Sequence, residues 1–383
     1  MQLDDVRVLD LTRLLPGPYA TQLLADLGAE IIKIEDPNVG DYARWMPPRT
    51  DDGTGAIFAA VNRGKQSVAL DLKSEDGIEA FFQLLEDADV VVEGFRPGVA
   101  ERLGVDYDTV SERNPDVVYC SITGYGQDGP HSDRAGHDLG YVGLSGLLDM
   151  TRSGPDATPQ IPGYPIADMA GGMSAAFGIV SGLLSRELGD GTGTYLDVSL
   201  TDAVVSFSQV VALPALLGDK PRPSETHLTG ALPWYGVYET ADGAYVTLSA
   251  LEEKFWIAFC EAIDRPDLEG VHGTEDPAER DALREELESI FAERTRSAWA
   301  DLEEVDVPVE PVLSPAEALE HPQIESRGMV RRAENGYPAI VSPITADGSS
   351  GREGVPDHGE HMEAVLEEAG DDRAELDGVG SGN

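Results

Sequence analysis

Lysine is scarce in this sequence, with five residues in a chain of 383. Lysine and arginine together number 27 against 71 aspartates and glutamates, which gives a formal net charge of −44 at pH 7. The acids are spread along most of the chain and do not form one tail. Such a surface repels phosphate backbones and anionic lipids, so we expect neither nucleic acid nor membrane as a partner. It also suits a cytosol near molar salt, where screening shortens to about 3 Å, and therefore predicts a halophilic, archaeal source.

Cysteines and long apolar runs are also few. Cys120 and Cys260 lie in apolar settings, which excludes a disulfide framework, gives no metal-ligand spacing and favours buried structural thiols. No apolar run approaches the about 20 residues that a membrane helix needs. The first residues carry acids and a strand pattern where a signal peptide has lysines and an apolar core. We therefore expect a cytoplasmic protein without a metal.

Strand and helix patterns alternate in the first half of the chain. The predicted strands are Val6–Leu11, Ala29–Ile34, Asp89–Glu93 and Val117–Ile122, and the predicted helices are Tyr19–Leu27 and Ser74–Leu85. This alternation favours an α/β fold with a mostly parallel sheet. A long helix from Asp168 to about Arg186 is rich in glycine and alanine, which implies close packing against another helix or a ligand.

The pattern changes near Gly218. Two strand patterns, Tyr235–Thr240 and Ala244–Ser249, flank Ala-Asp-Gly and predict a hairpin. Helices are predicted next at Lys254–Ile263, Glu279–Arg294 and Ser297–Glu304, followed by a strand at Val307–Leu313. We expect a large domain over 1–215, a smaller α/β domain over 225–315, and a C-terminal stretch over 316–383 that returns to the large domain.

Gly124–Gly129 matches the dinucleotide-binding pattern G-x-G-x-x-G literally. That site needs a helix directly after the glycines to hold the pyrophosphate, and here Pro130 and a polar stretch follow. We expect a turn that brings backbone close to a ligand, and no nicotinamide or flavin.

Several polar residues are candidates for chemistry or binding. Asp168 opens the small-residue helix, where it either caps the helix or faces a cleft. His137, beside Asp138, is either a core histidine or an oriented base, and Asp138 either a cap or part of that pair. Arg96 and Arg102 form surface salt bridges or bind phosphate.

Taken together, these segments resemble the class III CoA-transferase family, which includes carnitine and bile-acid CoA-transferases, formyl-CoA transferase and α-methylacyl-CoA racemase. The resemblance covers almost the whole chain. It rests on Val8–Ile34, Asn62–Lys65, Asp71–Lys73, Glu93–Gly98, Gly124–Pro130, Ala135–Asp138, Ile166–Gly172 and Gly359–His361.

The resemblance implies a Rossmann-like large domain that binds CoA, a smaller α/β domain, and a homodimer of two interlocked rings. It implies Asp168 as the catalytic carboxylate, with His137 and Glu252 as further catalytic residues; Glu253 is the alternative to Glu252. CoA would be a co-substrate and no cofactor would be bound permanently. The implied CoA contacts are Leu72, Lys73, Gly94, Phe95, Arg96, Arg102, Gly136, Asp138 and Tyr141.

Two branches of the family remain open. Leu11–Arg13 and Gly40–Arg44 resemble transferases, which use the aspartate as a nucleophile. Ala135–Asp138 and Ala250–Phe255 resemble racemases, which exchange a proton at the α-carbon. We favour transfer of CoA between short organic acids, for example from succinyl-CoA to a C4–C5 dicarboxylate such as mesaconate. A racemase or epimerase is the alternative, and a CoA-binding protein without catalysis is the second.

Overall fold

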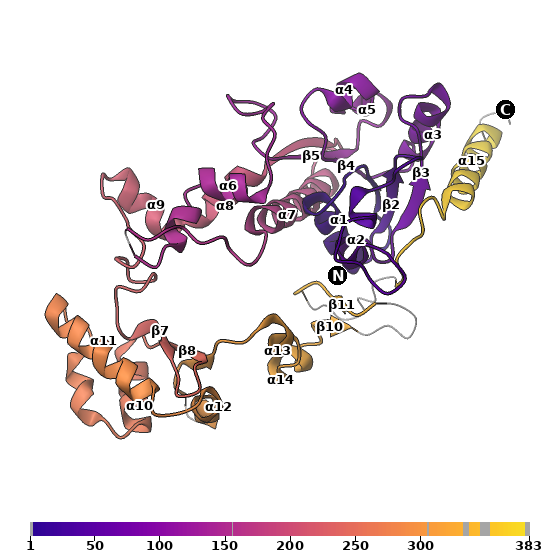
Figure 1. Cartoon of the computed structure of the whole chain (residues 1–383). Coiled ribbons are helices and arrows are strands. Elements are labelled where there is room, and N and C mark those ends of the chain that lie inside the picture. Colours follow the sequence, from indigo (N-terminus) through magenta and orange to yellow (C-terminus); the bar gives the residue numbers. More distant parts are fainter. Residues whose placement is uncertain (1–2, 155, 305, 332–336, 345–352, 380–383) are drawn as a thin grey trace. The chain divides into compact units, whose positions relative to one another are not determined.

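The computed structural model describes residues 3–154, 156–304, 306–331, 337–344 and 353–379, which form two compact units (Figure 1). Unit 1 comprises Met1–Leu147, Pro162–Ser208 and Glu325–Asn383, and unit 2 comprises Leu148–Ile161 and Gln209–Ile324. Each unit has its own hydrophobic core. The predicted α/β class is confirmed, while the predicted division into domains 1–215, 225–315 and 316–383 stays a prediction.

Unit 1 is built around a six-stranded sheet in which all strands are parallel. In spatial order the strands are β3 (Gln66–Ala69), β2 (Glu30–Glu35), β1 (Arg7–Asp10), β4 (Val90–Glu93), β5 (Val118–Thr123) and β6 (Thr194–Ser199). Runs of buried β-branched residues, as in β4, are typical of strands covered on both faces. The strand order reverses between β1 and β4, and in open α/β sheets ligands bind at the carboxyl ends of the strands at such a point.

Helices cover both faces of this sheet. Helices α1 (Pro16–Asp26) and α7 (Ile166–Leu188) pack on one face, and α3 (Glu75–Leu85), α5 (Tyr107–Arg113) and α15 (Met362–Val379) pack on the other (Figure 1). Ser74 caps α3 by accepting the Gly77 N–H at 3.0 Å. The other short elements of unit 1 are η1 (Tyr42–Arg44), α2 (Ala56–Val61), α4 (Val99–Leu103), α6 (Asp138–Leu144), α8 (Leu200–Val205), η3 (Ser206–Ser208), β10 (Val330–Arg331) and β11 (Ala339–Ile340).

The small residues of α7 allow its close approach to its neighbours. A Cβ atom on Gly171 would lie 2.1 Å from Leu200 Cδ2, and one on Gly172 would lie 2.5 Å from the Pro16 carbonyl oxygen. The prediction of close helix packing is confirmed. By length and composition alone α7 could cross a membrane, contrary to our expectation that no run would be long enough. Half of that apolar window is buried against α1, the sheet and α8, which is typical of a core helix in a globular fold.

Unit 2 contains a three-stranded antiparallel sheet. The predicted hairpin forms β7 (Tyr235–Glu239) and β8 (Tyr245–Ser249), and the predicted later strand forms β9 (Val309–Pro311) beside β8. The core under this sheet is aromatic, with Trp234, Trp256, Phe259, Phe291 and Trp299 buried together. The other elements are η2 (Leu148–Thr151), α9 (Gln209–Leu216), α10 (Glu253–Ala262), η4 (Pro266–Val271), α11 (Pro277–Phe291), α12 (Arg296–Ala300), η5 (Asp301–Glu304) and α13 (Pro315–Leu319). In the sequence, α14 (Pro322–Ser326) includes the last residues of unit 2 and the first residues of the final segment of unit 1.

Candidate active site

Four fully buried charged side chains gather around Asp10, the last residue of β1. We call Asp10, Lys33, Asp41 and Lys65 the buried ion network. Lys65 Nζ lies 3.1 Å from Asp10 Oδ2, and Lys33 Nζ lies 3.1 Å from Asp41 Oδ2. Burial alone would raise the pKa of Asp10, but Lys65 and Lys33 hold it well below its usual range. Burial lowers the pKa of Lys65 to about 8 in spite of Asp10. Both lysines are therefore charged partners of buried carboxylates at neutral pH.

The network fixes the loop that follows β1. The Asp41 carboxylate accepts the backbone N–H of Leu14 at 3.0 Å, and Leu14 has a φ of 68°, which is unusual for a leucine. Next to Asp41, Glu35 accepts two hydrogen bonds from Arg44, at 2.8 and 2.7 Å. Burial opposes ionisation of Glu35, but the Arg44 hydrogen bond and the charge of Lys33 lower its pKa to about 2. The loop is thus held while Arg13, between these contacts, stays exposed.

A cavity of about 230 Å³ lies at the carboxyl ends of β1 to β4. Its wall includes Arg13, Leu72, Lys73 and Phe95, three of which are predicted CoA contacts. The turn carrying Phe95 is shaped by Glu93, whose carboxylate accepts the Phe95 N–H at 2.6 Å. Burial raises the pKa of Glu93 to about 7. Glu93 was not among the predicted site residues, although an acid that ends an otherwise apolar strand is a visible signal.

Arg96 and Arg102 follow this turn and are both exposed. Arg96 precedes α4, and Arg102 lies within it. Neither arginine forms an ion pair within the described part of the chain, where Arg7, Arg44, Arg63 and Arg186 all do. The surface salt bridges considered for Arg96 and Arg102 are therefore not found among these residues. Their guanidinium groups are available for a phosphate.

The ring of Tyr141, from helix α6, packs against the glycine-containing segment that follows β5. A Cβ atom on Gly124 would lie 2.4 Å from Tyr141 Cε1, and one on Gly136 would lie 2.6 Å from the same atom. Both positions therefore need glycine to accommodate this ring. No helix follows Gly124–Gly129 before α6 in the described chain, so the context of a dinucleotide motif is absent there. Burial raises the pKa of Tyr141 to about 12, with smaller effects from charges that include Asp168 and Arg96.

Asp168 is the third residue of α7 and is half-buried. It does not cap the helix: the N-cap position is Pro165, and no side chain of the N-cap residue makes a capping hydrogen bond. Asp138 Oδ1 instead accepts the backbone N–H groups of Ala167 at 2.6 Å and Asp168 at 3.1 Å. Burial, and secondarily the charge of Asp138, raise the pKa of Asp168 to about 7. Asp168 is thus a carboxylate left free for chemistry.

The other two predicted catalytic residues are exposed. His137 is the N-cap residue of α6, adjacent to Asp138, and its carbonyl accepts the Gly140 N–H at 2.8 Å. Glu252 belongs to unit 2, at the N-cap of α10, beside Glu253 at the first position of that helix. The structure brings Asp138, Tyr141 and Asp168 together in unit 1, with His137 next to Asp138 in the sequence. A role for Glu252 or Glu253 opposite Asp168 stays a prediction.

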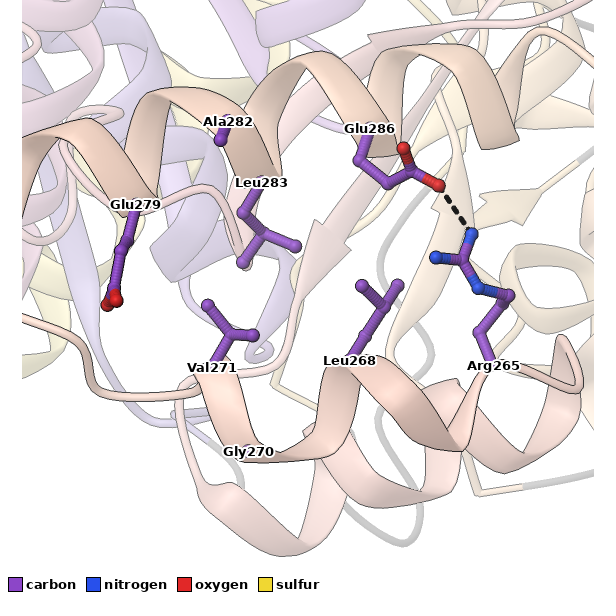
Figure 2. A pocket seen from close by; sticks show the side chains of 8 residues that line it. All are labelled: Arg265, Leu268, Gly270, Val271, Glu279, Ala282, Leu283 and Glu286. Atoms are coloured by element: carbon purple, nitrogen blue, oxygen red, sulfur yellow. Dashed lines mark hydrogen bonds and ion pairs between the residues drawn. The ribbon is translucent and has the colours of Figure 1, made fainter.

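Unit 2 has a separate hollow of about 390 Å³ between η4 and α11. Figure 2 shows apolar side chains from both elements facing each other, with the Arg265–Glu286 ion pair at one end. None of the predicted site residues lines it. Its two carboxylates, Glu279 and Glu286, are not predicted site residues, and Glu286 is paired with Arg265.

Comparisons with known proteins identify the family of this chain. A family model described as CoA-transferase family III matches residues 3–362. A succinyl-CoA:mesaconate CoA-transferase of Haloarcula marismortui is 37% identical over an alignment of 393 positions, which covers 97% of this chain and 97% of that protein. A human succinyl-CoA:glutarate CoA-transferase is 35% identical, covering 87% of this chain and 76% of that protein.

A comparison with a solved structure also indicates this family. A CAIB/BAIF family protein from Brucella suis superposes with a TM-score of 0.82 at 31% identity, covering 96% of this chain and 99% of its own. The family model spans nearly the whole sequence, and several relatives exceed 30% identity over most of both chains. The chain therefore belongs to CoA-transferase family III.

Proposed function

We propose that this protein transfers CoA between short organic acids, with Asp168 as the nucleophile. The observation that carries the proposal is the setting of Asp168. Its carboxylate accepts no hydrogen bond from the described residues and forms no ion pair with them, and its pKa is raised by burial to about 7. A carboxylate without such partners is a better nucleophile than one held by a cation.

The chemistry follows from a carboxylate attacking a thioester. Asp168 attacks the carbonyl carbon of the donor acyl-CoA, and the CoA thiolate leaves the resulting tetrahedral adduct, so that a mixed anhydride between Asp168 and the donor acid remains. The thiolate then attacks the Asp168 carbonyl carbon, which forms an aspartyl-CoA thioester and releases the donor acid as a carboxylate. An acceptor carboxylate reverses these steps, becomes the new acyl-CoA and leaves Asp168 free. No net proton is gained or lost.

The substrates we propose are succinyl-CoA as donor and a C4–C5 dicarboxylate such as mesaconate as acceptor. The relatives described above are named for succinyl-CoA with mesaconate and with glutarate. An acetyl-CoA:oxalate CoA-transferase of Acetobacter aceti is also 34% identical over 376 residues. All these names describe transfer between short acids, which supports the substrate class.

CoA is proposed to lie at the carboxyl ends of β1 to β4, as a co-substrate that is not permanently bound. The exposed guanidinium groups of Arg96 and Arg102 would hold its phosphates. The cavity residues Leu72, Lys73 and Phe95, together with Gly94, would contact the rest of the nucleotide part. Gly136, Asp138 and Tyr141 would lie along the path toward Asp168.

We propose a homodimer with interlocked subunits because α7 and η3 leave apolar side chains uncovered in unit 1. Phe177 is 76% exposed and Leu188 79%, with Met173, Leu184 and Phe207 also exposed. A face of this kind is typical of an interface, and a second copy of the chain is the occupant that we propose. Sedimentation at nanomolar concentration checks this, because an active monomer would contradict it.

The proposed setting is the cytoplasm of a halophilic archaeon. The net charge of −44 is tolerable when salt screens repulsion between the acids. Its similarity to a protein from Haloarcula marismortui supports this setting. Thermal unfolding should shift to lower temperature when salt is reduced from molar to about 10 mM, where screening extends to about 30 Å; an unchanged transition would argue against a halophilic source.

A racemase or epimerase is the second candidate. The pKa of Asp168, about 7, also suits a base that removes and returns a proton at the α-carbon, and His137, at the N-cap of α6, is the second acid–base group that this candidate needs. This alternative predicts exchange of the α-proton with deuterium from heavy water in the absence of any acceptor acid. Transfer predicts no turnover without an acceptor.

Rapid quenching and mass spectrometry test the proposal. During turnover of succinyl-CoA with mesaconate in high potassium chloride, a CoA thioester should appear on the peptide containing Ile166–Gly172. Asp168→Asn should lose transfer by several orders of magnitude, since an amide is a poor nucleophile. Asp149→Asn, at an exposed position in unit 2, is the matched control. Deuterium exchange without an adduct and without use of any acid would overturn the transferase in favour of the racemase.

A further inference from the structure

We propose that Asp138 is a positioning residue for Asp168: its carboxylate holds the first turn of α7 and places a second negative charge beside the Asp168 carboxylate. The inference rests on the proposed role of Asp168 as nucleophile. It gives Asp138 a task distinct from the contact with CoA that the family resemblance implies.

The first part of the proposed role, holding the first turn of α7, rests on two hydrogen bonds. The first turn of a helix has N–H groups without partners inside the helix. Here one oxygen of Asp138, 29 residues earlier than Ala167, accepts two of them, at 2.6 and 3.1 Å. A side chain at the N-cap usually takes these N–H groups, and Pro165 at the N-cap of α7 cannot. Asp138 supplies the cap from outside, so Asp168 need not turn back onto its own helix.

Asp138 is itself held firmly. It is the first residue of α6, three residues before Tyr141, which is 7% exposed. The Tyr141 ring packs against Gly124 and Gly136 and meets Tyr125 edge to face with ring centroids 5.1 Å apart. Because this turn is packed, the Asp138 carboxylate has little freedom to move, and it therefore fixes the backbone at Asp168.

The second part of the proposed role is the negative charge that Asp138 places beside the Asp168 carboxylate. The titratable groups on elements packed against α7 are Tyr19 and Asp26 on α1, Tyr119 and Cys120 on β5, Tyr195 and Asp197 on β6, Asp202 on α8, and Asp138 and Tyr141 on α6 with His137 at its N-cap. After burial, Asp138 is the charge that raises the pKa of Asp168. The positive end of α7 acts in the opposite direction. Asp138 therefore offsets the helix dipole and keeps Asp168 a more basic carboxylate than the first turn of a helix alone would allow.

This arrangement has a consequence for the reaction. A more basic carboxylate is a stronger nucleophile once it is ionised, but it is ionised only near and above neutral pH. Replacing Asp138 by a neutral acceptor should move the ionisation of Asp168 to lower pH and slow the attack at high pH. A residue with a merely structural role would leave the ionisation midpoint in place.

The test compares Asp138→Asn, which keeps the acceptor oxygen and removes the charge, with Asp133→Asn, which removes an exposed charge in the preceding segment. Aspartate labelled with ¹³C at the side-chain carboxyl gives the titration of Asp168, whose signal is assigned by its loss in Asp168→Asn. We expect the midpoint to fall by about one pH unit in Asp138→Asn and to stay in place in Asp133→Asn. If Asp138→Asn is not recovered folded, Asp138→Ser, with a neutral hydroxyl acceptor, is measured in its place.

Formation of the CoA adduct is followed against pH in the same variants. The acid limb of its rate should move to lower pH in Asp138→Asn, and the rate above pH 8 should fall about tenfold. An unmoved NMR midpoint in the Asp138 variant overturns the inference, even if the adduct forms. A moved midpoint with no adduct in any variant supports the inference and overturns the proposed function instead, so the two failures are distinguishable.

Discussion

Unit 1 holds two sets of charged side chains, which the structure treats in opposite ways. In the buried ion network, Asp10 and Asp41 are fully buried and each lies 3.1 Å from a lysine ammonium group. Around the start of α7 and after β4, Asp168, Arg96 and Arg102 have no ion pair among the described residues. Burial raises the pKa of Asp168 to about 7, while the lysines hold that of Asp10 far lower in spite of its burial.

The difference teaches how to separate structural from functional charges in such an acidic protein. The chain has five lysines, and two of them, Lys33 and Lys65, are completely buried against carboxylates that fix the loop after β1. Many carboxylates in this chain could pair with a cation, and yet Arg96 and Arg102 form no ion pair among the described residues. We infer that the buried paired charges form the frame of the unit, and that Asp168, Arg96 and Arg102 lie on its ligand side.

Breaking the frame should have the largest effect on stability. Lys65→Met leaves Asp10 buried with one cation fewer, and we expect a loss of about 3–5 kcal/mol in the free energy of unfolding. Lys220→Met, at an exposed position, should change it by less than about 0.5 kcal/mol. Denaturant unfolding in high salt measures both. Equal stability of the two variants would mean that the pairing of Asp10 does not support the fold.

Removing an arginine that has no ion pair should weaken ligand binding and leave the stability of the fold unchanged. Arg96→Ala should weaken CoA binding by about 1.5–3 kcal/mol through loss of a charge-assisted hydrogen bond. Arg113→Ala is the control, because Arg113 is an exposed arginine that lies over the Phe82 ring. Calorimetric titration with CoA and dephospho-CoA gives the comparison. Equal affinities in all combinations would remove Arg96 from the phosphate site.

Removing the unpaired carboxylate should stabilise the protein, but only above a certain pH. An unfolded Asp168 ionises near its ordinary pKa of 3.8, whereas in the fold it stays protonated to about pH 7. Stability therefore falls as pH rises through this window, and Asp168→Asn escapes that fall. Allowing for its partial exposure, we expect a gain of about 2 kcal/mol at pH 8 and none at pH 3.5. A gain that is equal at both pH values would contradict the raised pKa.

A change in salt concentration should produce the smallest effect, and it should distinguish the Asp168 carboxyl group from the buried ion network. Asp168 is only half-buried, so raising salt from 0.1 to 1 M should screen Asp138 and lower the Asp168 midpoint by a few tenths of a pH unit. The buried ion network excludes solvent ions, and the Asp10 carboxyl signal should not move. Titration of the ¹³C-labelled aspartates at the two salt concentrations checks this; parallel shifts would show that both sets are equally accessible to salt.

Much of the fold was predictable from the sequence because its signals are local. Buried β-branched runs gave β1, β2, β4 and β5, and the Ala-Asp-Gly turn gave the hairpin of β7 and β8. Strand β3 was missed because Val68 is its only large apolar residue, so no apolar run marks it. Strand β6 was missed because its residues alternate between exposed and partly buried positions and form no apolar run.

The candidate site was predictable only where a motif carries it. Asp168 and the arginines lie in short motifs, so the sequence identified them. The capping of α7 by Asp138 joins residues 29 positions apart and has no local pattern. Likewise, nothing around Lys33 and Lys65 in sequence announces that they are buried, except that lysine is so rare in this chain. Contacts of this kind depend on the whole fold.

The aromatic core of unit 2 also determines what an optical experiment would observe. Of the four tryptophans, Trp234, Trp256 and Trp299 are nearly or fully buried in that core, while Trp45 in unit 1 is 55% exposed. Emission from the native protein should therefore come mainly from apolar surroundings, and iodide should quench only a minor fraction of it. Intrinsic fluorescence during unfolding will report unit 2 almost alone. A Trp45→Phe variant would make it a reporter of that unit only, so that unit 1 can be followed separately by circular dichroism.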